Sequence, residues 1–232
     1  PQALLSKTPM ILGLDGSQKM SKSRGNAVML SATEDETAKL IKTVTNGNNL
    51  VIISPRRMGK TGLIQYCYDK PEISNEYYTF FIDILHTSSL REFTYLLGKT
   101  IYETLLPRSK KMVTLFAQTI KSISGKFGFD PMTNLPTFNV ELGDIERPEY
   151  TLEEIFHYLE NADKPCIVAI DEFQQIAKYP EKNIEALLRT YIQKIKNSNF
   201  IKSFLYAWYL EFFIYIPQYF FRNNSISATI LF

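Results

Sequence analysis

The chain has 232 residues, of which 45% are hydrophobic and 22% are charged, and its formal net charge at pH 7 is +2. This composition is ordinary for a soluble globular protein of one domain, or of one domain with added fragments. The small net charge gives no strong signal for nucleic-acid binding. The two cysteines, Cys67 and Cys166, have no metal-binding spacing and lie in apolar runs, so we expect buried thiols. The N-terminal residues lack the basic-then-apolar pattern of a signal peptide, and we expect a cytoplasmic, reducing location.

Residues 1–45 contain a small loop with two lysines, at residues 19–23 (KMSKS). Two lysines on a small Ser-containing loop can hold the phosphates of ATP. The loop resembles the signature loop of class I aminoacyl-tRNA synthetases, and the flanking residues 13–16 (GLDG) and 23–26 (SRGN) make it similar to the tryptophanyl enzyme. That resemblance implies that Lys19, Ser21 and Lys22 contact the nucleotide. The synthetase core and its tryptophan pocket are not recognisable later in the chain, so we interpret residues 1–45 as a fragment that does not charge tRNA.

The next unit begins after the turn-rich residues 46–49 (NGNN). An apolar, β-rich run at 50–53 precedes a short loop that ends in Gly59-Lys60-Thr61, and a helix-like segment follows at 62–68. Strand, loop and helix in this order are the context of a phosphate-binding P-loop. We expect Lys60 to reach the β- and γ-phosphates of ATP and the Thr61 hydroxyl to ligate Mg²⁺. Gly59 allows the backbone to approach the phosphate without a Cβ.

The first position of the loop departs from the usual glycine, because Ser54 stands there. Two arginines inside the loop add positive charge where a triphosphate would lie. The residues that we expect at the nucleotide are Ser54, Pro55, Arg56, Arg57, Met58, Gly59, Lys60, Thr61 and Gly62.

The middle of the chain alternates between strand and helix patterns. Residues 77–84 are aromatic and β-branched and predict a second strand. Asp83 near its end is either a supporting residue of the site or, as we favour, the cap of the following helix. The remaining predictions are a helix at 88–106, a basic helix at 110–124, two short strands within 125–149, and a helix from a capping box at 151–154 through 159.

A second motif follows at 166–172. The continuous apolar run 166–170 predicts a strand that is buried on both faces of a parallel sheet, and it ends in Asp171-Glu172. Ligands bind at this end of the strands in open α/β folds. We expect Asp171 to hold Mg²⁺ through water and Glu172 to polarise the attacking water.

The order of these elements, with an amphipathic helix at 181–196, predicts an α/β fold: a P-loop NTPase three-layer sandwich with a parallel sheet, incomplete at its C-terminal end. Residues 46–201 resemble the archaeal-type branch of AAA+/STAND-like ATPases through 53–61 (ISPRRMGKT), 81–83 (FID) and 170–174 (IDEFQ). In that family Ser-Pro-Arg-Arg is the usual opening of the loop. The resemblance implies an ATPase or a molecular switch.

Residues 202–232 are apolar and rich in aromatic side chains. We recognise no polar sensor residue, arginine finger or lid there. The run at 204–221 is nearly long enough to span a membrane, but Glu211 and Pro217 interrupt it. We favour a reading-frame slip or a truncation near residue 201 over a membrane anchor.

We therefore predict Mg²⁺-dependent ATP binding with slow hydrolysis at most by residues 46–201. The alternatives are an inactive tryptophan–tRNA ligase fragment and a non-catalytic module that binds ATP or ADP to order its shape. A protein partner or a homo-oligomer stays open.

Overall fold

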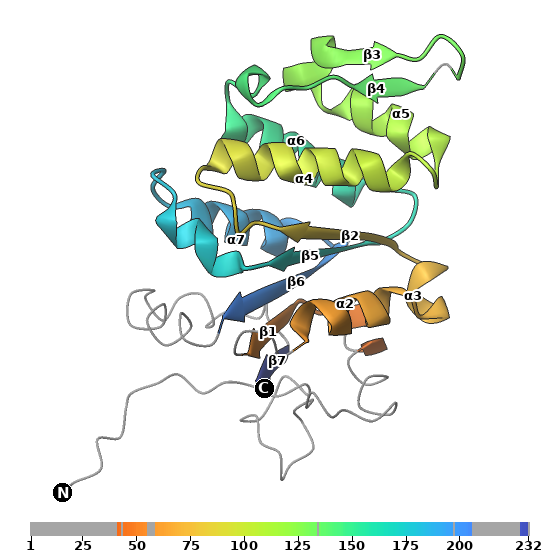
Figure 1. Cartoon of the computed structure of the whole chain (residues 1–232). Coiled ribbons are helices and arrows are strands. Elements are labelled where there is room, and N and C mark those ends of the chain that lie inside the picture. The colour runs from red at the N-terminus through yellow and green to blue at the C-terminus, as the bar shows by residue number, and fades with distance from the viewer. Residues whose placement is uncertain are drawn as a thin grey trace, which may run out of the picture.

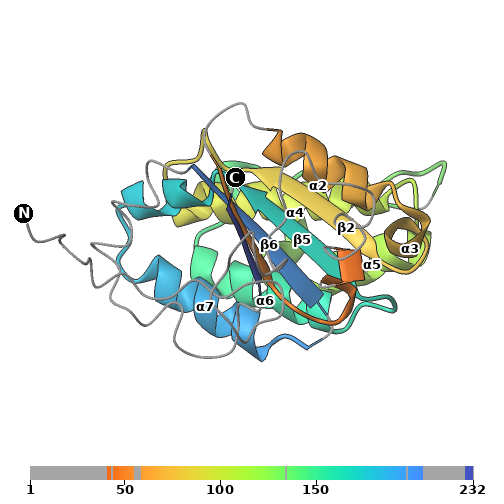
Figure 2. The same ribbon diagram turned by 90° about the horizontal axis from the view of Figure 1, so that it is seen from below.

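The computed structural model describes residues 41–42, 44–54, 59–133, 135–196, 198–205 and 228–231 (Figure 1). Its centre is a sheet of five strands in the order β2-β5-β6-β1-β7. These strands are β1 (Leu50–Ser54), β2 (Tyr78–Asp83), β5 (Cys166–Asp171), β6 (Ser198–Leu205) and β7 (Ala228–Leu231). All neighbouring pairs in the sheet are parallel, and Figure 2 shows β2, β5 and β6 side by side. The predicted parallel α/β fold is confirmed.

Helices cover both faces of this sheet (Figure 1). On one face lie α2 (Lys60–Tyr68) and α3 (Pro71–Ser74), and on the other lie α4 (Leu90–Leu105), α5 (Lys110–Thr119), α6 (Pro148–Glu160) and α7 (Ile184–Lys194). Alternation along the strands explains the two layers, since successive side chains of a strand point to opposite faces. In β5, Ile167 and Ala169 pack on the α2 side, whereas Val168 and Ile170 join the larger cluster on the α4 side.

The short elements complete the larger layer. The 3₁₀-helices are η2 (Lys121–Lys126), η3 (Leu142–Asp144) and η4 (Phe173–Lys178). The strands β3 (Phe127–Phe129) and β4 (Pro136–Phe138) lie within the range 125–149, where two short strands were predicted, and pair antiparallel. Phe127 and Phe138 lie opposite each other in this hairpin and pack edge to face, with ring centroids 5.7 Å apart. The two predicted strands are therefore present and form a hairpin.

Boundaries of three helices differ from the prediction by at least three residues. The basic helix α5 ends at Thr119, because Ile120 leaves helical geometry with φ −82° and ψ 79°. Helix α7 begins at Ile184, after Asn183 in the left-handed region. The predicted capping box at Thr151 is wrong, because α6 begins at Pro148 and the Thr151 amide already donates to the Arg147 carbonyl within the helix.

The predicted tail overlaps the sheet at two places. The boundary that we predicted at residue 201 falls inside β6, which continues to Leu205. Residues 228–231 form β7, which pairs with β1 in the register Leu50 to Ala228. Most of the predicted apolar run 204–221 lies outside the described residues. Among the helices that the structure does describe, none has the length and apolar character needed to cross a membrane.

Candidate functional site

The predicted P-loop joins β1 to α2 at one end of the sheet. Gly59 is the residue before α2, and its φ of +80° and ψ of +15° are in the left-handed region that favours glycine. Its carbonyl accepts a hydrogen bond from the Leu63 amide, so the helix begins at this turn. Lys60 is the first residue of α2 and is 7% exposed. The free amides at a helix N-terminus favour an anion at this point.

Thr61 and Asp171 lie in contact, although 110 residues separate them in the sequence. The Thr61 hydroxyl donates a hydrogen bond of 2.8 Å to Asp171 Oδ2. Asp171 is the last residue of β5 and is 6% exposed. The two residues predicted as Mg²⁺ ligands are therefore adjacent, one on the first turn of α2 and the other at the carboxyl end of β5.

The sheet topology explains this contact. Strand β6 lies between β1 and β5, so the loop and Asp171 are not on neighbouring strands. Residues 167 and 169 of β5 pack on the α2 side of the sheet, and the strand period of two directs Asp171 to the same side. Helix α2 runs on that face, and this brings Thr61 to the carboxylate.

Glu172 follows directly in an unusual backbone conformation. Its φ of +54° and ψ of +39° are left-handed, and it precedes η4 as the N-cap residue. The Glu172 amide donates to Asp171 Oδ1 at 3.0 Å. Its carboxylate Oε2 accepts a hydrogen bond from Gln174 Nε2. No role was predicted for Gln174 from the sequence, where the only signal is its position two residues after Glu172.

Asp83 lies level with Asp171 on the neighbouring strand, because the β2–β5 register pairs these two residues. The preferred prediction that Asp83 caps the next helix is wrong. Asp83 Oδ1 accepts instead from the Leu85 amide at 2.9 Å. The cap of α4 is Ser89, whose side chain accepts from the Glu92 amide, because the connection after β2 is long enough to place a serine there. Asp83 thus remains near the site, at the same edge of the sheet.

Several predicted residues cannot be placed at this site. Lys19, Lys22, Pro55, Arg56, Arg57 and Met58 lie outside the described residues. Ser54 ends β1, and Gly62 lies exposed in the first turn of α2. Both cysteines are buried and free, as predicted. Cys67 lies in α2 and Cys166 at the start of β5. Burial raises the pKa of the Cys67 thiol to about 11 and that of the Cys166 thiol to about 12.

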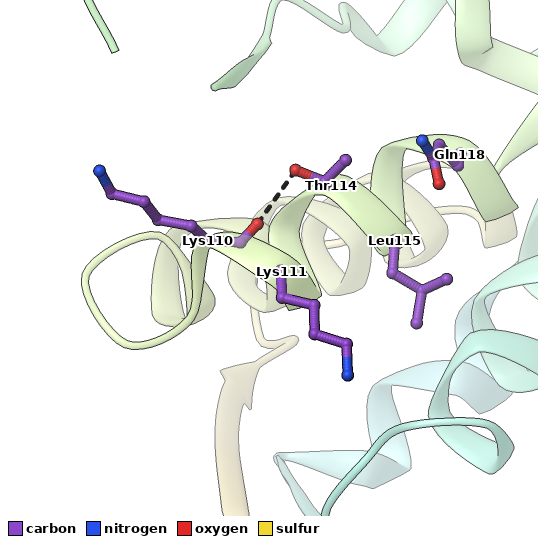
Figure 3. Close-up of a pocket in the computed structure, with 5 residues that line it drawn as sticks. All are labelled: Lys110, Lys111, Thr114, Leu115 and Gln118. Carbon is purple, nitrogen blue, oxygen red and sulfur yellow. Dashed lines mark hydrogen bonds between the residues drawn. The ribbon is translucent and has the colours of Figure 1, made fainter. Parts of the chain in front are cut away.

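The described residues contain no group of three or more His, Cys, Asp or Glu side chains that could hold a metal ion alone. A surface hollow occurs elsewhere, on α5, where Lys110, Lys111, Thr114, Leu115 and Gln118 line it. Figure 3 shows the two lysine side chains pointing in different directions from this helix. The Thr114 hydroxyl bonds to the Lys110 carbonyl of its own helix at 3.0 Å. This hollow shares no residue with the P-loop or the acidic pair.

Strand β1, the Gly-Lys-Thr turn and α2 follow one another at the carboxyl edge of a parallel sheet, and Asp171 lies beside Thr61. This arrangement is the fold of P-loop ATPases. Solved structures share this fold. The chain is similar to the Walker-type ATPase PABY2304 of Pyrococcus abyssi, with a TM-score of 0.51 and 21% identity over 85% of this chain and 52% of that one. It is also similar to the ORC2 protein of Aeropyrum pernix, solved as ADPNP-ADP complexes, with a TM-score of 0.52 and 14% identity over 85% of this chain and 46% of that one.

The chain spans about half the length of these two solved structures. Residues 1–114, of the 232 in the chain, match the family described as tRNA synthetases class I (W and Y). The matched range includes the KMSKS loop and extends through β1, α2, β2 and α4. Both resemblances predicted from the sequence, to a class I synthetase and to a P-loop ATPase, are therefore confirmed.

Proposed function

We propose that the P-loop domain binds Mg·ATP and hydrolyses it slowly. The observation that carries this proposal is the 2.8 Å hydrogen bond from the Thr61 hydroxyl to Asp171. The two residues come from separate motifs, and a nucleotide–metal site requires them side by side. The fold shared with a Walker-type ATPase and with a protein solved in ADPNP-ADP complexes supports the same function.

The residues at the site suit Mg²⁺, which prefers oxygen ligands and usually binds through one or two carboxylates together with substrate phosphates. Thr61 offers a hydroxyl oxygen and Asp171 a buried carboxylate. When bound, the ion would neutralise charge on the β- and γ-phosphates. Thr61 and Asp171 are the residues that would hold it.

The remaining side chains take separate roles around the triphosphate. Lys60 contacts the β- and γ-phosphates, and Gly59 permits close approach of the backbone. Glu172 orients the water that attacks the γ-phosphorus. In that step the water oxygen forms a bond to phosphorus, the bond to the bridging oxygen breaks, ADP leaves, and the water proton passes to Glu172 and then to solvent.

Calorimetry with Mg·ATP tests the binding site, using the full chain and the variant Lys60→Ala. We expect binding to the unaltered chain and at least a tenfold weaker affinity in the variant, because Lys60 pairs with the phosphates. Equal affinity in both proteins would contradict a nucleotide site at the P-loop.

A second experiment tests turnover. We expect Glu172→Gln to reduce the hydrolysis rate by about 10²-fold or more, since positioned acid–base groups contribute on that scale, while ATP still binds. Unchanged hydrolysis would refute the role of Glu172. Tight binding without measurable turnover in the unaltered chain would favour the non-catalytic nucleotide-dependent module.

The family match of residues 1–114 supports a second candidate, a tryptophan–tRNA ligase fragment. This function would place ATP at the KMSKS loop rather than at the P-loop. Lys22→Ala would then weaken ATP binding while Lys60→Ala would not, and an active fragment would in addition show tryptophan-stimulated exchange of pyrophosphate into ATP. Unchanged ATP binding in Lys22→Ala would exclude this candidate.

A further inference from the structure

The backbone around Glu172 is held on both sides of the residue. Its amide donates to Asp171 Oδ1 at 3.0 Å, and its carbonyl accepts from the Gln175 amide at 2.9 Å. A left-handed conformation is unfavourable at a residue with a Cβ, so these two hydrogen bonds stabilise a conformation that the residue would otherwise avoid. With the backbone constrained, the direction of the carboxylate depends on the side-chain torsions and on what contacts the carboxylate.

Gln174 makes that contact. Its side chain is 4% exposed, and its amide Nε2 donates to Glu172 Oε2. A buried amide is costly unless it is paired, and a hydrogen bond to an ionised acceptor is stronger than one between neutral groups. Gln174 therefore holds one carboxylate oxygen, and the other, Oε1, is the atom that we assign to the attacking water.

We propose that Gln174 is a positioning residue for ATP hydrolysis, which fixes the Glu172 carboxylate through its hydrogen bond from Nε2 to Oε2. This inference rests on the proposed function of Glu172 as the group that orients water. Gln174 does not touch the nucleotide in this proposal; it acts through Glu172. Small misplacement of a reacting group can cost about 10²-fold in rate, so loss of this bond reduces kcat.

The chain offers a matched control in the neighbouring residue. Gln175 lies on the same 3₁₀-helix, but its side-chain Nε2 donates to the Thr87 carbonyl at 3.0 Å and not to Glu172. The variants Gln174→Met and Gln175→Met make the same change, because methionine keeps the length of the side chain and removes the amide. Methionine is also tolerated at buried positions.

We expect Gln174→Met to lower kcat for ATP at least tenfold, while KM and the calorimetric Kd of Mg·ATP change less than threefold. Gln175→Met is expected to leave kcat within twofold. If Gln174 had a merely structural role, Gln174→Met would instead weaken the binding of Mg·ATP and lower the temperature of thermal unfolding, together with kcat. Unchanged kcat in Gln174→Met, or an increase in it, would overturn the proposal, since an increase means that the bond restrains the carboxylate away from the water.

A double-mutant cycle distinguishes failure of this inference from failure of the proposed function. If Gln174 acts through Glu172, Glu172→Gln with Gln174→Met is expected to be no slower than Glu172→Gln alone. Additive losses would overturn the proposal, because Gln174 would then act by another route. If Glu172→Gln by itself leaves hydrolysis unchanged, the role of Glu172 in the proposed function is refuted, and with it the role of Gln174.

Discussion

Two glycines at the start of α2 are in different backbone environments. Gly59 has a φ of +80°, whereas Gly62 is helical and an added Cβ there would meet no heavy atom within 4 Å. The first position therefore needs glycine for its conformation, and the second does not. Glycine at residue 59 is thus required by the backbone conformation of the phosphate loop, whereas glycine at residue 62 only lowers the helix propensity of α2.

We expect Gly59→Ala to lower the free energy of unfolding by about 1 kcal/mol and to weaken ATP binding, because a Cβ disfavours a positive φ. Gly62→Ala is expected to raise the free energy of unfolding by up to about 1 kcal/mol, since alanine is the better helix former. Urea denaturation of both variants measures the difference. Equal effects would contradict a left-handed turn at residue 59.

The Thr61 hydroxyl provides a second residue-level prediction. Thr61→Val keeps the shape of the side chain and removes the bond to Asp171. We expect it to abolish the Mg²⁺ dependence of ATP binding, whereas Thr61→Ser, which keeps the hydroxyl, is expected to retain it. Calorimetry with ATP at zero and at millimolar Mg²⁺ compares the two. A valine variant that still responds to Mg²⁺ would show that Thr61 is not a ligand.

At the scale of the elements, Glu154 links α6 to η2. This buried carboxylate accepts hydrogen bonds from the Lys121 amide at 3.1 Å, the Ser122 amide at 3.0 Å and the Ser122 hydroxyl at 2.6 Å. The sequence pattern at 151–154 predicted that Glu154 caps its own helix. In the structure it caps η2 instead, because Pro148 is well suited to the first position of α6 and moves the start of that helix upstream.

We expect Glu154→Ala to destabilise the protein by about 2–3 kcal/mol, because it removes a buried carboxylate that accepts three hydrogen bonds and leaves two amides of η2 without this acceptor. Glu153→Ala on the exposed face of the same helix is the control, and we expect a change of less than about 0.5 kcal/mol. Chemical denaturation measures both. Equal losses would mean that the contact with η2 contributes no stability.

At the scale of the whole molecule, one thiol lies in each of the two apolar layers that cover the sheet. Cys67 lies in the cluster on the α2 side, and Cys166 lies in the larger cluster on the α4 side. Burial raises the pKa of Cys67 to about 11 and that of Cys166 to about 12, from an ordinary value of 9.0. At a pH between 9.0 and these raised values, both thiols therefore stay protonated in the native state, whereas the thiols of an unfolded chain lose their protons.

This difference makes stability depend on alkaline pH. Between about pH 9 and pH 11–12 the unfolded state binds fewer protons than the native state, so the free energy of unfolding falls as the pH rises. The slope is up to about 1.4 kcal/mol per pH unit for each thiol. Below pH 8 the thiols contribute no slope. Urea denaturation across this range measures it.

The control for the pH series is the double variant Cys67→Ala with Cys166→Ala. Buried tyrosines such as Tyr68 and Tyr158 also have a raised pKa because of burial, and they add to the slope above pH 10 in both proteins. We expect the double variant to have the shallower slope. Identical slopes would contradict the protonated state of the native thiols.

The sequence by itself determined the types of the elements and the positions of the two motifs along the chain. The apolar run 166–170 predicted a doubly buried strand, and β5 is buried throughout. The Gly-Lys-Thr turn predicted the start of a helix, and α2 begins at Lys60. These features depend on local periodicity and on the conformational freedom of glycine, and both can be recognised within a short window of sequence.

Only the tertiary structure decided which elements meet. The insertion of β6 between β1 and β5, the addition of β7, the contact of Thr61 with Asp171 and the acceptor role of Glu154 all join residues that are distant in the chain. A local pattern states which face of a strand or helix is apolar, but it does not name the partner of that face. The order of strands in a sheet follows from the packing of all the elements together, and the site at its edge is a consequence of that packing.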